Sequence, residues 1–112
     1  MKFIVRGADN LSIQKVYNYP NPFSDYTNFF FEHNQNDMNL DITIDIFNMA
    51  GGKVKELKAT LLSTGYTSTP IFWDGKDENG NKIRQGIYIY RILLRSLKGS
   101  VLSKAQKMII MN

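Results

Sequence analysis

The feature that most constrains the fold is a strict alternation of apolar and polar residues in the segment Leu40–Ile46. Leucine or isoleucine occupies every second position, and aspartate or threonine fills the positions between. A period of two is typical of a β-strand with one face in a core and the other in water, and a helix would need a period of 3.6. We therefore expect Leu40 and the three isoleucines to face the core, and Asp41 and Asp45 to face water.

Similar strand-like runs recur along the chain, and turn-forming residues separate them. β-Branched and aromatic residues, which favour strands, are frequent in these runs. Asn79-Gly80 predicts a hairpin turn of type I′, in which both central residues have positive φ. Pro20 and Pro22 predict a bend or an edge, because proline cannot donate to a β-ladder. The predicted strands are residues 13–18, 27–34, 39–48, 53–61, 68–74, 86–96 and 100–111, with a further candidate at 2–6.

About seven short strands with regular turn signals predict an all-β fold, an Ig-like antiparallel β-sandwich, as one domain over residues 13–112. Residues 1–12 are either an N-terminal linker or an extra edge strand. The chain has 112 residues, 43% of them hydrophobic, which suffices for a core without metal or disulfides. Gly80 and Gly86 are expected to serve turns. The predicted core residues are Phe29, Phe31, Ile42, Ile44, Val54, Leu57, Trp73, Tyr88, Tyr90 and Ile92.

The composition argues against most enzyme classes. The chain has no Cys, which rules out a thiol nucleophile, Cys-ligated zinc, iron–sulfur clusters and disulfides within it. The only histidine, His33, leaves no multi-histidine metal site and at most one imidazole for a catalytic triad. No Gly-rich phosphate loop occurs in the sequence. We therefore predict no catalytic residue and no cofactor.

Charge is unevenly distributed, although the net charge is only +4. Residues 1–56 carry 5 Lys/Arg against 7 Asp/Glu, whereas residues 57–112 carry 9 against 3. A basic half is able to meet an anionic partner, but nucleic-acid binding needs denser clusters and a motif, and neither is found. No apolar run is long enough for a signal peptide or a membrane helix. We expect either a cytosolic protein or a fragment of an exported protein whose export signal lies elsewhere.

The oxygen-rich loop at residues 73–81 is the one candidate for a metal site. Asp74, Asp77 and Asn79 are weak candidate ligands for calcium, which takes six to eight oxygens. The loop matches the EF-hand spacing only in part, and lysines sit among the donors. The favoured interpretation is a hairpin loop whose Asp and Asn side chains bond their own backbone.

His33 ends a run of phenylalanines and lies between Glu32 and Asn34. A single histidine on an apolar face is usually a residue at the core edge that bonds to a backbone carbonyl. We favour that interpretation, and a ligand or pH-sensing role is the alternative.

Five local strings stand in the order of one family: Tyr19–Phe23, Asp45–Gly51 with Lys53-Val54, Trp73–Asn81, Gly86–Arg91 and Lys107–Met111. Together they resemble the C-terminal domains of the type IX secretion system, which are related to the Ig-like domain of flagellar hook-capping proteins. The resemblance covers about residues 16–112. Gly52 departs from it, because the family usually has Arg or Lys there.

The string Phe31-Glu32-His33-Asn34 narrows the resemblance to the PorU-like, gingipain-type sortases. The resemblance implies a non-catalytic sorting and docking domain of a surface cysteine peptidase, whose catalytic domain lies outside this chain. It implies export to the cell surface or outer membrane of a Gram-negative, Bacteroidetes-type bacterium. The implied partners are an outer-membrane β-barrel of the PorV type and the translocon. We expect a monomer in isolation.

The final stretch, residues 101–112, carries most of the partner-binding candidates. It ends apolar, with basic residues before the apolar end. It is the last core strand, and under the resemblance its end is also a sorting signal that the translocon reads. The candidates are Lys104, Lys107, Met108, Ile109, Ile110 and Met111, together with His33.

Two other functions fit a β-sandwich with this sequence. The first is a cleavable C-terminal sorting domain of an ordinary type IX cargo protein. The second is a carbohydrate- or calcium-binding module, in which Tyr26, Phe30 or Tyr66 would stack on sugars and Asp77 would ligate a metal.

Overall fold

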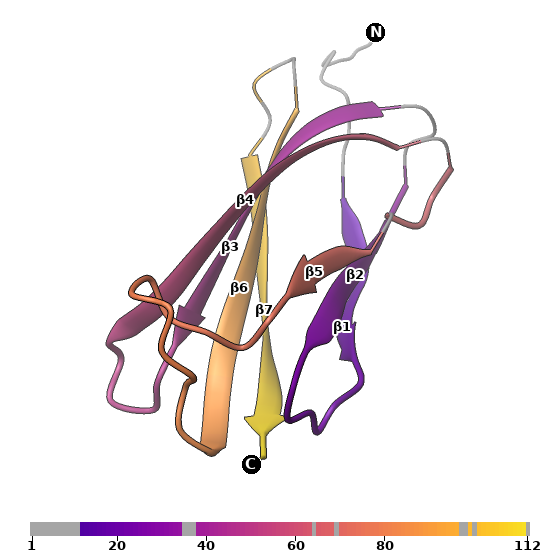
Figure 1. Cartoon of the computed structure of the whole chain (residues 1–112). Coiled ribbons are helices and arrows are strands. Elements are labelled where there is room, and N and C mark those ends of the chain that lie inside the picture. The colour runs from indigo at the N-terminus through magenta and orange to yellow at the C-terminus, as the bar shows by residue number, and fades with distance from the viewer. Residues whose placement is uncertain are drawn as a thin grey trace, which may run out of the picture.

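Seven antiparallel strands form two sheets that pack face to face in the computed structural model (Figure 1). The structure describes residues 12–34, 38–63, 65–68, 70–96, 99 and 101–111. One sheet has the order β1-β2-β5 and the other β4-β3-β6-β7. The predicted all-β sandwich is confirmed. The strands are β1 (Ile13–Tyr19), β2 (Thr27–His33), β3 (Met38–Phe47), β4 (Lys53–Ser63), β5 (Ile71–Trp73), β6 (Gly86–Ser96) and β7 (Val101–Ile110).

The predicted strands agree with the observed ones to within about two residues at each end. The exception is β5, which is shorter than the predicted 68–74. Ser68 and Thr67 do pair with β2, through the bond from Ser68 N to Phe31 O (2.8 Å) and a bridge between Thr67 and Glu32. Three steps along β2, from Phe29 to Glu32, correspond to four steps along the paired segment, from Ile71 to Thr67, so the register shifts between the bridge and β5. The candidate strand at 2–6 lies outside the described residues.

β3 is one of the two central strands of the larger sheet and pairs with β4 and β6. Its inward side chains, from Leu40 to Ile46, are at most 2% exposed, as the alternation predicts. Asp45 differs from the prediction, because it is only 4% exposed. It points outward, but Arg91 donates to it from the neighbouring strand (2.8 Å) and Lys53 lies 3.3 Å away. The pattern indicated the face correctly and could not show that two cations cover it.

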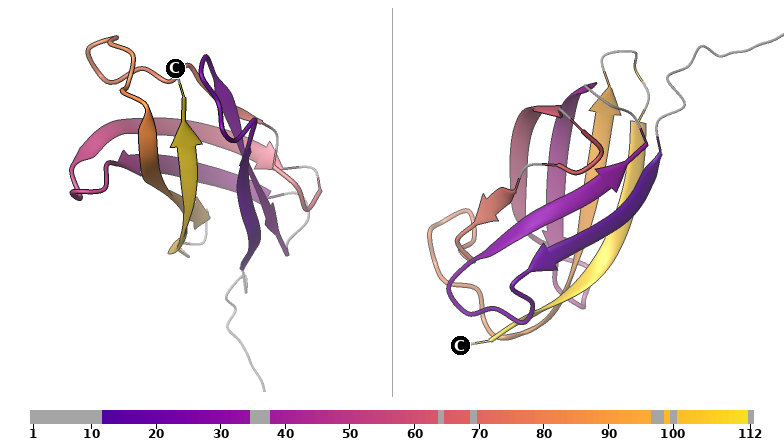
Figure 2. Two further views of the ribbon diagram at one scale, coloured as in Figure 1. Left: turned by 90° about the horizontal axis from the view of Figure 1, so that it is seen from below. Right: turned by 90° about the vertical axis from the view of Figure 1, so that its right-hand side faces the viewer.

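Figure 2 shows the two sheets from two further sides. Aromatic rings pack between them. Phe29 of β2 meets Tyr90 of β6 edge to face, with ring centroids 4.8 Å apart, and stacks on Trp73 at 6.2 Å. The indole N–H of Trp73 donates to the carbonyl of Lys76 (3.0 Å). Burial raises the pKa of the Tyr90 phenol.

Eight of the ten predicted core residues are buried. The other two, Val54 and Leu57, are only partly buried and pack against the core. Both belong to β4, an edge strand of its sheet, where a side chain has neighbours on one flank only. Their prediction as full core members is therefore wrong.

Two tight turns share one hydrogen-bond pattern. In residues 77–81, Gly80 N donates to Asp77 O (3.1 Å), and Asp77 Oδ1 accepts from the backbone N–H groups of residues 79 and 81. The β3–β4 turn repeats this pattern with Asn48 and Gly51. The two glycines have φ of 84° and 92°, which favours glycine. The predicted type I′ turn is wrong in register: the central residues are 78 and 79, and Gly80 follows them in the left-handed region.

The start of β6 carries a tyrosine corner, a feature typical of Ig-like sandwiches. The hydroxyl of Tyr88 donates to the carbonyl of Arg84, four residues upstream (2.7 Å). Burial raises the pKa of this phenol. Gly86, with φ of 154°, leads the chain from this corner into the strand.

Candidate functional site

The end of β7 has two sides with different chemistry. Met108 and Ile110 point inward and are at most 2% exposed, so they belong to the core. Ile109 points outward with 41% of its surface exposed, directly opposite Ile87 of β6, which is 46% exposed. Lys107 precedes it on the same outward side and is exposed. The last strand therefore presents one outward row of a cation and an apolar side chain.

The loop between β1 and β2 holds this strand end in place. Ile109 N donates to the side-chain oxygen of Asn21 (3.0 Å). Phe23 forms a parallel bridge with Ile110, in which Phe23 N donates to Ile109 O (3.1 Å) and Met111 N donates to Phe23 O (2.7 Å). We call these contacts the terminal clamp. Since β7 is an edge strand, the clamp satisfies backbone groups that would otherwise meet water.

The clamp loop is itself anchored in the core. The phenyl ring of Phe23 is 3% exposed and meets Trp73 edge to face at 5.7 Å. The buried hydroxyl of Thr27 donates to Pro20 O (2.8 Å) and accepts from the amide of Asn18 (3.1 Å). The peptide bonds before Pro20 and Pro22 are cis. Through its bonds to Ile109 and Met111, the string Tyr19–Phe23 fixes the last strand. Sequence reasoning missed this role, since it predicted a bend or an edge there and used the string as a family motif.

A hollow of about 280 Å³ lies beside the clamp. It brings the loop together with Met111, whose side chain is 51% exposed. The C-terminal end and the proline-rich loop thus share one surface. The lining residues are Pro20, Pro22, Phe23, Ser24, Asp25, Tyr26 and Met111.

The structure divides the predicted partner-binding residues near the C-terminus into an exposed and a buried group. Lys104, Lys107, Ile109 and Met111 are exposed on or next to β7. Met108 and Ile110 are not available to a partner, because they are buried between the sheets. The sequence could not separate the groups, because Met108–Met111 is apolar at every position, so its inward and outward residues look alike.

His33 lies apart from these residues, since it ends β2 while the clamp loop precedes the start of that strand. Its side chain is 0% exposed, and its ring lies 5.8 Å from that of Phe31 and 6.4 Å from that of Tyr66. A hollow of about 340 Å³ borders it, lined by Gln14, His33, Asn34 and Tyr66. A partner contact at His33 stays a prediction, and it would have to act through the exposed Tyr66.

The predicted metal candidates lie in the loop between β5 and β6. Asp74 Oδ1 accepts from Lys76 N (3.1 Å), and Asp77 Oδ1 accepts from two backbone N–H groups. Asn79 is exposed. In the part of the chain that the structure describes, no three His, Cys, Asp or Glu residues come close enough to hold a metal ion. The two aspartates have the self-bonded arrangement that the favoured interpretation predicted.

A further acid of this loop, Glu78, ties it to the edge of β4. Its carboxylate accepts from Glu56 N (3.0 Å) and from the Lys55 ammonium (3.2 Å). The backbone N–H and, next, the ammonium hold the pKa of Glu78 below its ordinary value of 4.5. The pKa of Glu56 is lowered likewise by Lys53 and Lys58.

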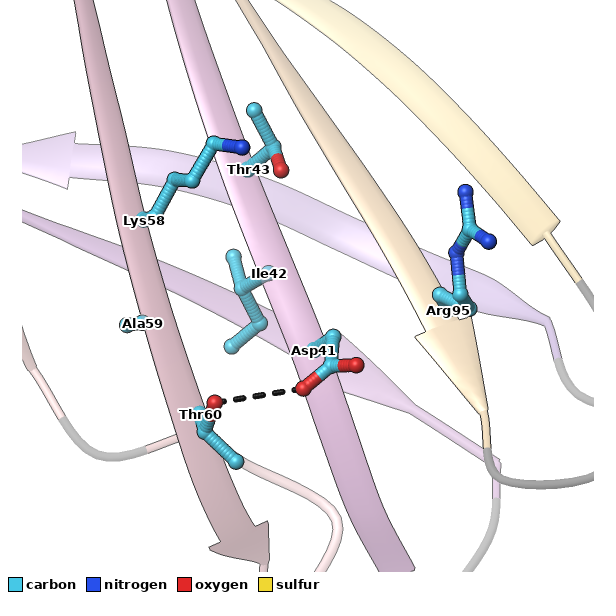
Figure 3. A pocket seen from close by; sticks show the side chains of 7 residues that line it. All are labelled: Asp41, Ile42, Thr43, Lys58, Ala59, Thr60 and Arg95. Carbon is cyan, nitrogen blue, oxygen red and sulfur yellow. Dashed lines mark hydrogen bonds between the residues drawn. The ribbon is translucent and has the colours of Figure 1, made fainter.

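A hollow of about 500 Å³ lies over β4, β3 and β6, and Figure 3 shows the side chains that line it. Thr60 donates to Asp41 (3.1 Å), and Lys58 and Arg95 bring positive charge to the same hollow. Charges of both signs stand here, and the lining residues include a single carboxylate, whereas glycosidases use a pair. The remaining lining residues are Ile42, Thr43 and Ala59. Among the described residues, no helix is long and apolar enough to cross a membrane.

Comparisons with known proteins identify the family and related folds. Residues 17–111 match the family described as "Secretion system C-terminal sorting domain". The crystal structure of dimeric latent PorU from Porphyromonas gingivalis is similar, with 29% identity and a TM-score of 0.79; the match covers 96% of this chain and 10% of that one. A beta-glucuronidase from Parabacteroides merdae shares the fold alone, with 6% identity and a TM-score of 0.62 over 91% of this chain and 14% of that one. No curated protein matches.

Proposed function

Because this chain belongs to the secretion system C-terminal sorting domains of the type IX pathway, which are non-catalytic, we propose that it is the docking domain of a PorU-like surface sortase. Membership of this family implies that the domain is part of an exported, cell-surface protein. The 29% identity with PorU over almost the whole chain supports the sortase origin. The chain spans about a tenth of that PorU. In this proposal the peptidase domain lies in another part of the protein, and the domain stays attached at the outer membrane.

The proposed partner is an outer-membrane β-barrel of the PorV type, and the proposed contact is the outward row of β7. The observation that carries the proposal is the terminal clamp, which bonds the end of β7 to the β1–β2 loop and so holds its outward residues in place. Lys107 and Ile109 stand on that edge, and Ile87 widens its apolar part. A fixed apolar centre with a cation at its rim is typical of protein interfaces.

Truncation is a poor test of this contact. Removing the last residues would delete Met108 and Ile110, whose burial stabilises the fold. Deletion of two such side chains would cost several kcal/mol, which is a large part of a domain's stability. Surface substitutions that leave the core intact are therefore needed.

The test is capture of the purified barrel protein by the immobilised domain. We expect the double variant Lys107→Glu with Ile109→Asp to bind about tenfold more weakly, because it reverses the charge and removes the apolar contact. The control is Lys58→Glu, on the other edge strand, where the side chain is 74% exposed. Equal binding by the folded double variant would refute the proposed contact.

The sortase origin is tested separately, in the whole protein. We expect mass spectrometry of surface proteins from the native cell to find this domain still joined to a Cys/His peptidase. Recovery of the domain cleaved from an unrelated enzyme or adhesin would contradict the sortase origin and establish an ordinary cargo role.

A further inference from the structure

The outward face of the three-stranded sheet is unusually rich in aromatic rings. Tyr17 and Tyr19 of β1, Phe30 of β2 and Phe72 of β5 alternate with buried neighbours and so point away from the core. Tyr26, just before β2, joins them. We call these five residues the aromatic face. The right-hand view of Figure 2 looks onto β1 and β2.

The rings of the aromatic face are ordered by one another. Tyr17 stacks on Phe30 across the strands, with centroids 4.9 Å apart and planes 11° apart. Tyr26 stacks on Phe72 at 5.8 Å and 23°. Each pair restricts the rotamers of its members before any ligand arrives, which lowers the entropy lost on binding. Tyr19 stands in the same cross-strand row as Phe72, with Asn28 between them.

The exposed area indicates the size of the occupant. Tyr19, Phe72 and Tyr26 are 70%, 60% and 47% exposed. With 150–250 Å² for each aromatic side chain, these three expose on the order of 350 Å². A patch of this size on a monomer is often functional. It is well below the roughly 800 Å² that each side of a stable protein–protein interface buries, so the face suits a smaller ligand.

The chemistry of the face points to a sugar. The C–H side of a pyranose packs on aromatic rings, while its hydroxyls need donors and acceptors. The hydroxyls of the three tyrosines and the amide of Asn28 supply both. The charged residues that face outward on these strands are Lys15 and Glu32, which stand opposite each other in the register. Because their charges cancel locally, the face favours an uncharged ligand over a phosphate or another anion.

From these observations we infer that the aromatic face binds a neutral oligosaccharide of a few residues. The sequence had named Tyr26, Phe30 and Tyr66 for sugar stacking. The structure gathers the first two with Tyr17, Tyr19 and Phe72, and leaves Tyr66 beside His33. The inference does not depend on docking by β7, which belongs to the other sheet.

The experiment is an NMR titration of the ¹⁵N-labelled domain with four probes: cellohexaose, xylohexaose, mannohexaose and chitohexaose. We expect at least one probe to shift amides of β1, β2 and β5. The double variant Tyr19→Ala with Phe72→Ala should bind that probe about tenfold more weakly. The matched control is Tyr66→Ala, because Tyr66 is 55% exposed but lies off the face. Thermal unfolding of each variant checks the fold.

Three results would overturn the inference. The first is that none of the four probes shifts the spectrum. The second is that Tyr66→Ala weakens binding as much as the double variant does. The third is that the sugars leave the domain unchanged while the double variant loses capture of the outer-membrane barrel, which would make the face a protein-docking surface.

Discussion

The two outward faces of the sandwich are built in different ways. On the four-stranded sheet, Asp45 is enclosed by Arg91 and Lys53, so that outward charges are neutralised by neighbours across the strands. On the three-stranded sheet, rings pair with rings, and Tyr19 and Phe72 remain mostly exposed. Alternation along a strand decides which side faces outward. The residue opposite on the next strand decides whether that side is closed off or left available to a ligand.

The largest effect is expected in β5, where the adjacent residues Phe72 and Trp73 point to opposite sides of the sheet. Trp73→Ala should lower the free energy of unfolding by about 3–5 kcal/mol, because it removes a buried indole that packs against Phe29 and Phe23. Phe72→Ala, one residue earlier and 60% exposed, should change it by less than about 0.5 kcal/mol. Urea unfolding of both variants measures the difference, and similar losses would contradict the distinction between the faces.

The next effect tests how charges on the outward face of the four-stranded sheet are neutralised. Asp45→Ala should cost about 1–2 kcal/mol, because it removes the acceptor of the Arg91 guanidinium and the ion-pair partner of Lys53, which are themselves partly exposed. Asp41→Ala, on the same face, should change stability by less than about 0.5 kcal/mol, because Asp41 is exposed and has one bond to Thr60. If the two variants lose equal stability in urea, Asp45 is not the enclosed group that we describe.

A smaller effect is expected at the terminal clamp, which joins a loop of one sheet to the edge of the other. Asn21→Ala should cost about 1 kcal/mol and speed hydrogen exchange at the Ile109 amide, because that amide loses its acceptor. Asp25→Ala, in the same loop with 86% of its side chain exposed, is the control. Unchanged exchange at Ile109 in the Asn21 variant would mean that the clamp bond is not formed in solution.

The smallest effect concerns pH and the loop that covers the edge of β4. The pKa of Glu78 is lower in the folded state than its ordinary value of 4.5, so its contribution to stability is present above that value. The contribution is lost as the pH falls through the folded pKa. Melting curves from pH 6 to pH 3 should therefore show a smaller acid destabilisation for Glu78→Gln than for the wild type. Parallel curves would contradict the bond to Glu56 N.

Much of the fold was predictable because its strands carry a clear period of two. The inward residues of β3 and the central position of β6, apolar in both phases, follow directly from the sequence. β2 was harder to interpret, since Phe29, Phe30 and Phe31 are aromatic on both faces. Only the pairing with β1 and β5 shows that the outward Phe30 belongs to a larger set of rings.

The candidate site was less predictable, because it is made by contacts between residues far apart in the chain. Asn21 and Ile109 are 88 positions apart, and no local pattern relates a side-chain oxygen to a distant edge amide. One signal was present: Asn21 stands between Pro20 and Pro22, which have no N–H to donate. Neither neighbour can therefore satisfy the side-chain oxygen of Asn21, which is left for a more distant donor. The burial of Asp45 was hidden for the same reason, since Arg91 lies 46 positions away.

Affinity for the outer-membrane barrel, measured side by side for two double variants of the folded domain, decides whether the last strand or the aromatic face does the docking. We predict that Lys107→Glu with Ile109→Asp lowers the affinity about tenfold, while Tyr19→Ala with Phe72→Ala leaves it unchanged. An unchanged affinity for the first variant, or a loss confined to the second, would contradict docking through the clamped end of β7.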